Sequence, residues 1–141
     1  MTPDLPVALL REGLARHGRV HLVARGQSMR PLVPDGSLCE IVRLHAMPRP
    51  GQLVAAVRGE VVIVHRVIAV TASLVQTRGD GARRADPPWR AADLLGLVSR
   101  VRLPVGLRYA PDLGPVGRAI ALVQRFRRKA DGFFDREGDG F

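Results

Sequence analysis

One serine, one histidine and two aspartates stand in this chain in an order that suits nucleophilic catalysis. Ser28 comes first, His65 follows, and Asp80 and Asp86 come after both. A hydroxyl, an imidazole that accepts its proton and a carboxylate that orients the ring are the parts of a nucleophile–base–acid set. The order and the residue types predict such a set, but spacing alone leaves open which aspartate orients His65.

The surroundings of Ser28 and His65 fit these roles. Ser28 lies between Gly26 and Pro31, in a stiff, non-helical connection that can hold a hydroxyl in one orientation. His65 lies inside an apolar run at 61–70. Burial on an apolar strand face disfavours the charged form of the ring. The neutral imidazole that this favours can accept a proton. Strict alternation places it on one face with four apolar residues, Val61, Ile63, Val67 and Ala69.

Short β-branched runs between turn residues dominate the middle of the chain. Six strands are predicted, at 20–24, 38–43, 53–57, 61–70, 74–77 and 95–103. Breakers such as Pro34-Asp35-Gly36 and Gly79-Asp80-Gly81 separate them. The pattern predicts a mainly β domain over 19–105 rather than alternating strands and helices.

The two ends have a helical pattern. A short helix is predicted within 1–18, with Thr2 as N-cap, Pro3 in the first turn and Gly18 as its end. A basic helix is predicted over 112–130, followed by a flexible tail at 131–141.

Composition limits the function classes. The 141 residues, of which 46% are hydrophobic and 25% charged, suit one globular domain. No uninterrupted apolar run approaches the roughly 20 residues of a membrane-spanning helix, and the N-terminus lacks the pattern of a secretory signal. We therefore expect a cytoplasmic protein.

The charge and the metal-binding residue types narrow the list of partners. Of the 22 basic residues all but Lys129 are arginine, most are scattered, and aromatics make up only 4%. This pattern argues against a nucleic-acid partner despite the net charge of +9. One cysteine excludes an internal disulfide, and the four histidines have no metal-ligand spacing, so we expect no metal and no cofactor.

Three further features allow two interpretations each. The basic run at 125–129 either lies on a helix packed against the β domain or makes peripheral contact with an anionic membrane. Trp89, just after Asp86, either shields the site edge or fills the core. Cys39 alternates with apolar residues in a strand, which favours a buried thiol over a reactive one.

An ordered set of motifs gives the chain a family resemblance. It resembles the signal peptidase I and LexA-type serine peptidases over about residues 20–103. The motifs that carry the resemblance are Gly26-x-Ser28-Met29-x-Pro31, Asp35-Gly36, Gly51-Gln-Leu-Val, His65-Arg66-Val67, Gly79-Asp80, Asp86 and Gly96-Leu-Val. The resemblance implies a signal-peptidase/LexA-like β-fold.

Within that superfamily the chain looks most similar to the archaeal and endoplasmic-reticulum branch, which uses serine and histidine. His65 stands where the Ser–Lys members have lysine, and the only lysine of the chain is Lys129. The resemblance implies Ser28 as nucleophile, His65 as general base, Asp86 as orienting acid and Asp80 as a supporting carboxylate. It also makes the neighbours of Ser28 substrate-binding residues, namely Gly26, Gln27, Met29 and Pro31.

The chain departs from the family pattern in two informative ways. A short polar helix precedes the serine motif where signal peptidases carry a membrane anchor. Gly26 replaces a common serine, so the oxyanion would rest on backbone N–H groups, that of Ser28 among them. A self-cleaving repressor does not fit, since the chain has no Ala-Gly dipeptide and too few residues ahead of the β domain for a DNA-binding domain.

The sequence therefore predicts a serine endopeptidase that cleaves an extended peptide or protein substrate through an acyl-enzyme. By resemblance the substrate lies beside a strand, with small side chains before the cut. The alternative is a catalytically silent module that holds a peptide or protein in the same groove.

Overall fold

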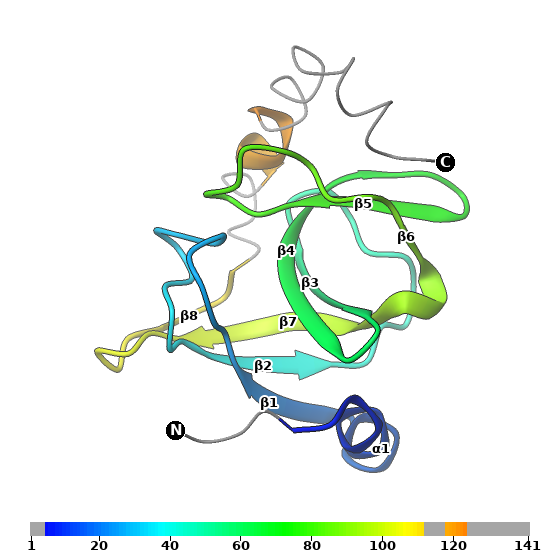
Figure 1. Ribbon diagram of the computed structural model, residues 1–141, viewed down its shortest axis with the longest axis vertical. Helices are drawn as coiled ribbons and strands as arrows, with labels where there is room; N and C mark the ends of the chain where they lie inside the picture. The colour runs from blue at the N-terminus through cyan, green and yellow to red at the C-terminus, as the bar shows by residue number, and fades with distance from the viewer. Residues whose placement is uncertain (1–4, 112–117, 124–141) are drawn as a thin grey trace.

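One antiparallel sheet of eight strands makes up most of the protein (Figure 1). The structure is a computed structural model that describes residues 5–111 and 118–123. Its elements in chain order are α1 (Val7–His17), β1 (Arg19–Val23), β2 (Leu38–Val42), β3 (Leu53–Arg58), β4 (Val61–Val70), β5 (Leu74–Arg78), β6 (Trp89–Arg90), η1 (Ala91–Asp93), β7 (Leu94–Arg102) and β8 (Arg108–Tyr109). The predicted mainly β class is confirmed.

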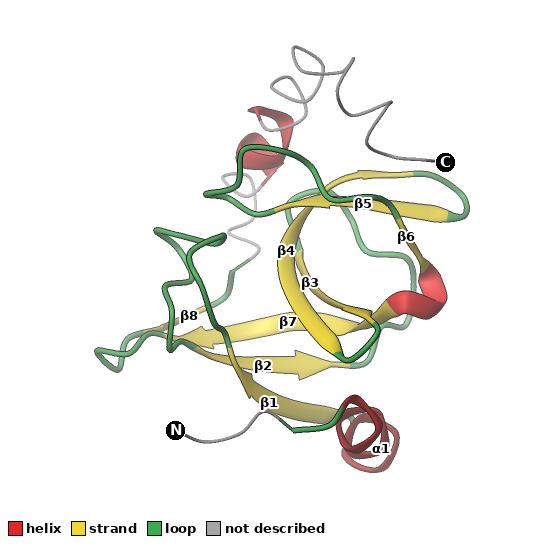
Figure 2. Ribbon diagram, in the orientation of Figure 1, coloured by secondary structure: helices red, strands yellow, loops and turns green. Residues whose placement is uncertain are grey.

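The sheet is strongly curved. Its strand order is β1-β2-β7-β3-β4-β5-β6, with β8 paired to β7. Figure 2 shows β1, β2 and β7 together at one end and β5 and β6 at the other, with β3 and β4 curving between them. Register shifts interrupt three pairings, between β2 and β7, β3 and β7, and β4 and β5. Such bulges add local twist and bend a sheet.

The strand β3 is buried on both faces because it lies between two hydrophobic clusters. Leu53 and Ala55 belong to the cluster that also contains Leu10 and Leu14 of α1. Val54 and Ala56 belong to the second cluster, which includes Trp89. Alternate residues of a strand point to opposite faces, so an apolar run without alternation fits a strand covered on both sides.

The N-terminal helix begins later than predicted. Pro6, not Thr2, is the N-cap residue of α1, and Thr2 lies outside the described residues. A proline disfavours the helical conformation of the residue before it. Leu5 precedes Pro6, so the helix does not extend back to Leu5. The predicted end is confirmed, since Gly18 adopts φ 76° and its N–H donates to the Leu14 carbonyl.

Little of the predicted C-terminal helix lies in the described part of the chain. Residues 118–123 are helical, whereas the rest of 112–130 and the predicted tail at 131–141 lie outside the described residues. Among the described residues, no helix combines the length and the apolar character that crossing a membrane requires.

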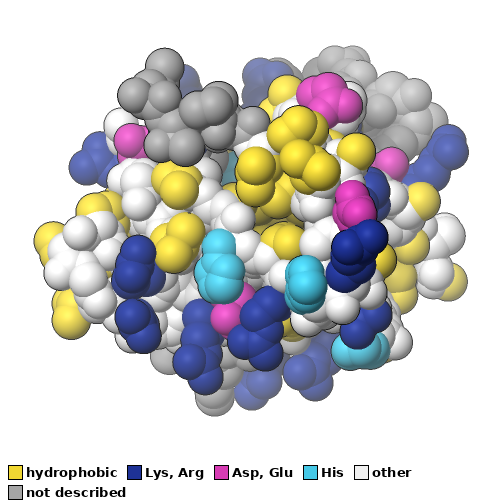
Figure 3. All heavy atoms as spheres, turned by 90° about the horizontal axis from the view of Figure 1, so that it is seen from below, with side chains coloured by type: hydrophobic (Ala, Val, Ile, Leu, Met, Phe, Trp, Pro, Cys, Tyr) yellow, Lys and Arg dark blue, Asp and Glu magenta, His cyan; other side chains and the backbone are white. Residues whose placement is uncertain are grey.

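The outer face of β1, β2 and β7 carries basic side chains and histidines around one carboxylate (Figure 3). Glu40 accepts hydrogen bonds from Ser99 at 2.7 Å and Arg19 at 3.5 Å, and His21 lies 3.6 Å from it. The hydrogen bond from Ser99, with the nearby positive charges, holds the pKa of Glu40 below its usual value. Glu40 thus offsets part of the positive charge on this face.

Candidate functional site

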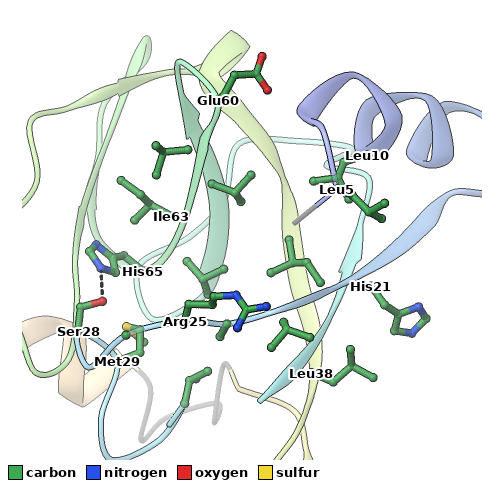
Figure 4. A pocket seen from close by; sticks show the side chains of 18 residues that line it. Leu5, Leu10, His21, Arg25, Ser28, Met29, Leu38, Glu60, Ile63 and His65 are labelled. Carbon is green, nitrogen blue, oxygen red and sulfur yellow. Dashed lines mark hydrogen bonds between the residues drawn. The ribbon is translucent and has the colours of Figure 1, made fainter. Parts of the chain in front are cut away.

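Ser28, His65 and Asp86 form a continuous hydrogen-bonded set. The Nε2 atom of His65 lies 2.9 Å from Ser28 Oγ (Figure 4). Its Nδ1 atom is hydrogen-bonded to Asp86 Oδ2 on the other side of the ring. The His65 residue is only 8% exposed, so water competes little for these bonds. The imidazole can accept the Ser28 proton on one nitrogen while a carboxylate faces the other.

Two loops that are far apart in the sequence bring Ser28 to this position. Ser28 lies in the loop 24–37 that joins β1 to β2, and the loop 79–88 after β5 contacts it (Figure 2). The Gly81 N–H donates to the Ser28 carbonyl at 2.7 Å, and the Gly26 N–H donates to Asp35 Oδ1 at 2.7 Å. Gly26 adopts φ 91°, which favours glycine over other residues.

The strand β4 places His65 opposite Val54 of β3, in the buried part of the sheet. The predicted apolar face is correct for Ile63 and Val67, but it does not continue to Ala69. A register shift between Val67 and Ala69 disturbs the alternation. Val70 instead packs against the cluster that contains Val67.

Asp80 is not the carboxylate behind the His65 ring. It receives two hydrogen bonds from Arg66, from Nε to Oδ1 and from Nη2 to Oδ2, both at 2.9 Å. The Arg66 side chain is fully buried and that of Asp80 is 6% exposed. Arg66 also donates to the Gly51 carbonyl at 2.7 Å. Asp80 instead forms a buried ion pair that anchors the loop 79–88 to β4, and its predicted role as a supporting carboxylate in catalysis stays a prediction.

The position of Asp86 depends on Thr77 and Trp89, and the sequence analysis did not predict that these residues hold the carboxylate. Thr77 Oγ1 donates to Asp86 Oδ2 at 2.6 Å, and Trp89 Nε1 donates to Thr77 Oγ1 at 2.8 Å. Trp89 is completely buried, so it belongs to the core and does not shield the site edge from solvent. Only the short separation of these residues from Asp86 in the sequence could have pointed to them.

Gly79 packs directly against the hydroxyl and the imidazole. A Cβ atom at this position would lie 2.5 Å from the Ser28 carbonyl oxygen and 2.9 Å from His65 Nε2. Both distances are shorter than van der Waals contact, and the first involves backbone. The structure therefore requires glycine here for a steric reason.

We expect Gly79→Ala to separate Ser28 Oγ from His65 Nε2 beyond hydrogen-bond distance, because the added Cβ atom must displace the Ser28 backbone or the imidazole. A crystal structure of the variant measures this separation, with circular dichroism to confirm that the fold persists in solution. Arg83→Ala, at an exposed position of the same loop, is the control and should keep the wild-type distance. An unchanged distance in Gly79→Ala would show that this contact does not constrain the site.

An apolar cleft of about 660 Å³ leads to Ser28 and His65. Figure 4 shows these two residues at one end and Leu5 and Leu10 at the other. One side is formed by β1 and the segment that follows it, and the other by residues 60–65. Of the four predicted substrate-binding residues, Gly26 and Met29 line the cleft, whereas Gln27 and Pro31 are not among its lining residues.

Both sides of the cleft carry a strand edge that the described residues leave unpaired. β1 pairs with β2 alone, and the part of β4 before Arg66 pairs with β3 alone. Neither the Ser28 N–H nor the Met29 N–H donates a hydrogen bond to another described residue. Backbone groups are therefore available to an extended peptide and to an oxyanion at Ser28.

Cys39 lies away from this site and is fully buried in β2, as the strand pattern predicted. Burial raises the pKa of its thiol to about 12. We expect the native protein to be almost inert to Ellman's reagent at pH 8, because the thiolate is the reacting species. The same assay in guanidinium chloride should release one equivalent. A fast reaction of the native protein would contradict the burial of Cys39.

Within the described residues there is no group of three histidine, cysteine or acidic side chains that could hold a metal ion.

Comparison with known proteins finds no matching family model, no matching curated protein and no matching solved structure. A functional assignment therefore rests on the chain's own residues and their geometry.

Proposed function

We propose that this protein is a serine endopeptidase that cleaves extended peptide or protein substrates through an acyl-enzyme. The observation that carries the proposal is the Ser28–His65–Asp86 set, with its hydrogen bond of 2.9 Å from Ser28 Oγ to His65 Nε2, at the end of an apolar cleft. The motif resemblance to signal peptidase I and LexA-type peptidases supports the same assignment. A signal-peptidase/LexA-like fold is part of this proposal.

In the proposed reaction His65 Nε2 takes the proton from Ser28 Oγ as the oxygen attacks the scissile carbonyl. Asp86 keeps the other ring nitrogen protonated and stabilises the imidazolium that forms. The imidazolium then gives its proton to the leaving amine, and the acyl group remains on Ser28. A water molecule, deprotonated by His65, attacks the ester and releases the second product.

The cleft suits an extended substrate that adds a strand to the sheet. Its two sides, β1 and the first half of β4, each have one edge that no described strand pairs with. A peptide paired to either edge would place every second side chain in the cleft, since strand residues alternate. The lining predicts a preference for apolar side chains at those positions. The negative charge that develops on the carbonyl oxygen would be stabilised by backbone N–H groups at Ser28 and Met29.

A peptide library tests the proposal across many candidate substrates at once. The library is a proteome digested with trypsin, and mass spectrometry identifies new termini after incubation with the protein. We expect new termini that share an apolar pattern before the cut and that are absent with Ser28→Ala. Termini that persist with Ser28→Ala would overturn the assignment of Ser28.

The same experiment separates the peptidase from a silent binding module. Peptides that co-purify with both proteins, with no new termini in either sample, would indicate binding without cleavage. That outcome would overturn the peptidase proposal in favour of the module.

A further inference from the structure

The hydrogen bonds of the site continue past Asp86 into the core. Trp89 Nε1 lies 2.8 Å from Thr77 Oγ1, which lies 2.6 Å from Asp86 Oδ2. Trp89 is 0% exposed and Thr77 is 1% exposed. The Asp86 N–H also donates to the Thr77 carbonyl at 2.8 Å, so two bonds join these residues. A buried network of this kind persists only when each member has its partner.

The groups at the two ends fix the direction of each of these hydrogen bonds. An indole N–H can only donate, so Thr77 accepts from Trp89. An ionised carboxylate can only accept, so Thr77 donates its one hydroxyl proton to Asp86 Oδ2. That oxygen is an acceptor and lies against His65 Nδ1. The ring proton then belongs on Nδ1, and the other nitrogen, Nε2, is left to accept the proton of Ser28.

We propose that Thr77 and Trp89 are positioning residues that hold the Asp86 carboxylate in place and set the tautomer of His65. This inference rests on the proposed peptidase function for its kinetic consequences, although the hydrogen bonds themselves do not depend on it. Neither residue touches the substrate or the reacting atoms. Their effect on the reaction passes through Asp86 and His65.

Arg58 packs on the ring of Trp89, the last residue in this series of hydrogen bonds. Its guanidinium carbon lies 3.9 Å from the centre of the Trp89 ring. A cation over the ring face restrains an indole without competing for its N–H. Val75 pairs with Trp89 across β5 and β6, which fixes the backbone on the other side. The indole N–H is thus directed at Thr77 by packing on both the ring and the backbone.

Conservative variants separate the hydrogen bonds from the packing. Thr77→Val keeps the β-branched shape that suits a strand but removes the hydroxyl, whereas Thr77→Ser keeps the hydroxyl. Trp89→Phe keeps an aromatic ring and removes the N–H donor. Thr71→Val makes the same replacement at an exposed turn and serves as the matched control.

Kinetics with the peptide that the library shows to be cleaved best provide the first readout. We expect Thr77→Val to lower kcat about 10–100-fold, by analogy with the loss seen when an outer hydrogen-bond partner that orients a metal ligand is removed. KM should stay within about twofold, because the cleft is unchanged. Thr77→Ser should recover most of the wild-type kcat. Trp89→Phe should lower kcat less than Thr77→Val does, and Thr71→Val should leave kcat unchanged. Wild-type kcat in Thr77→Val, or a Thr77→Ser rate as low as that of Thr77→Val, would overturn the inference.

Proton NMR provides a readout that does not need turnover. The proton on His65 Nδ1, held in the hydrogen bond to Asp86, should give a far-downfield resonance that disappears in His65→Gln. We expect Thr77→Val to move or broaden this resonance and Thr71→Val to leave it in place. If the wild-type protein cleaves no peptide, the proposed function fails while this measurement still decides the inference. A resonance that is the same in Thr77→Val and wild type would overturn it.

Discussion

Replacement of Asp86 by asparagine is expected to lower kcat by about 10⁴-fold, the size of effect known for this change in a Ser–His–Asp set. The carboxylate accepts a hydrogen bond from the His65 Nδ1–H group, whereas an amide can present an N–H group there. The ring would then carry its proton on Nε2, where Ser28 needs an acceptor. The measurement is the cleavage rate of one peptide by wild type and Asp86→Asn, with circular dichroism as the check on folding.

Asp80→Asn is the matched control for this prediction. Its carboxylate pairs with Arg66 rather than with His65, so its replacement should affect stability much more than kcat of the folded protein. A loss of less than tenfold in Asp86→Asn would contradict the assignment of Asp86. A loss of about 10⁴-fold in well-folded Asp80→Asn would show that Asp80 acts in the chemistry.

Arg66→Met is expected to lower the free energy of unfolding by about 3–5 kcal/mol, which is the usual cost of removing one partner of a buried ion pair. Asp80 would remain buried without the two hydrogen bonds that Arg66 donates, and the Gly51 carbonyl would lose its donor. The residue is fully buried, so water cannot replace the guanidinium easily. Urea unfolding followed by circular dichroism measures the loss.

The double variant Arg66→Met/Asp80→Leu tests the cause of this loss. Replacing both members of a buried pair by apolar groups is often close to neutral, so the double variant should recover a large part of the stability. A single variant that loses less than about 1 kcal/mol would contradict the buried pair, since that is the range of exposed ion pairs. No recovery in the double variant would assign the loss to the hydrogen bonds that Arg66 donates to the Gly51 and Pro111 carbonyls.

The six longer strands were predictable because turn residues separate them and because each is long enough to show a pattern. The strands β6 and β8 have two residues each and were not predicted. A two-residue strand has no alternation to detect, and its pairing depends on the strand beside it. The predicted start of α1 was wrong for a local reason. Pro6 disfavours a helical conformation in the residue before it, so the helix begins after Pro6.

The members of the site were predictable by type, and their contacts were not. Ser28 and His65 are 37 positions apart, and only the sheet brings them together. The choice between Asp80 and Asp86 depends on which face of β4 each reaches. His65 and Arg66 are consecutive, so their side chains point to opposite faces of the strand. One carboxylate can therefore pair with Arg66 while the other reaches His65, a distinction that sequence spacing does not contain.

Thr77 and Trp89 show a further limit of sequence reasoning. Threonine and tryptophan are common in strands for packing reasons, so neither type signals a contact with a catalytic carboxylate. Their hydrogen bonds depend on the pairing of β5 with β6, which places Trp89 opposite Val75.

The most direct test of the central claim is the detection of an acyl group on Ser28. The segment of the best-cleaved peptide that precedes the cut, prepared with a 4-nitrophenyl ester at its C-terminal carbonyl, has a leaving group good enough to make deacylation the slow step, so the acyl-enzyme should accumulate. We predict a burst of one nitrophenol per protein molecule and, after acid quench, an adduct that mass spectrometry locates on Ser28. Turnover with no burst, or an adduct on any other residue, would contradict the account.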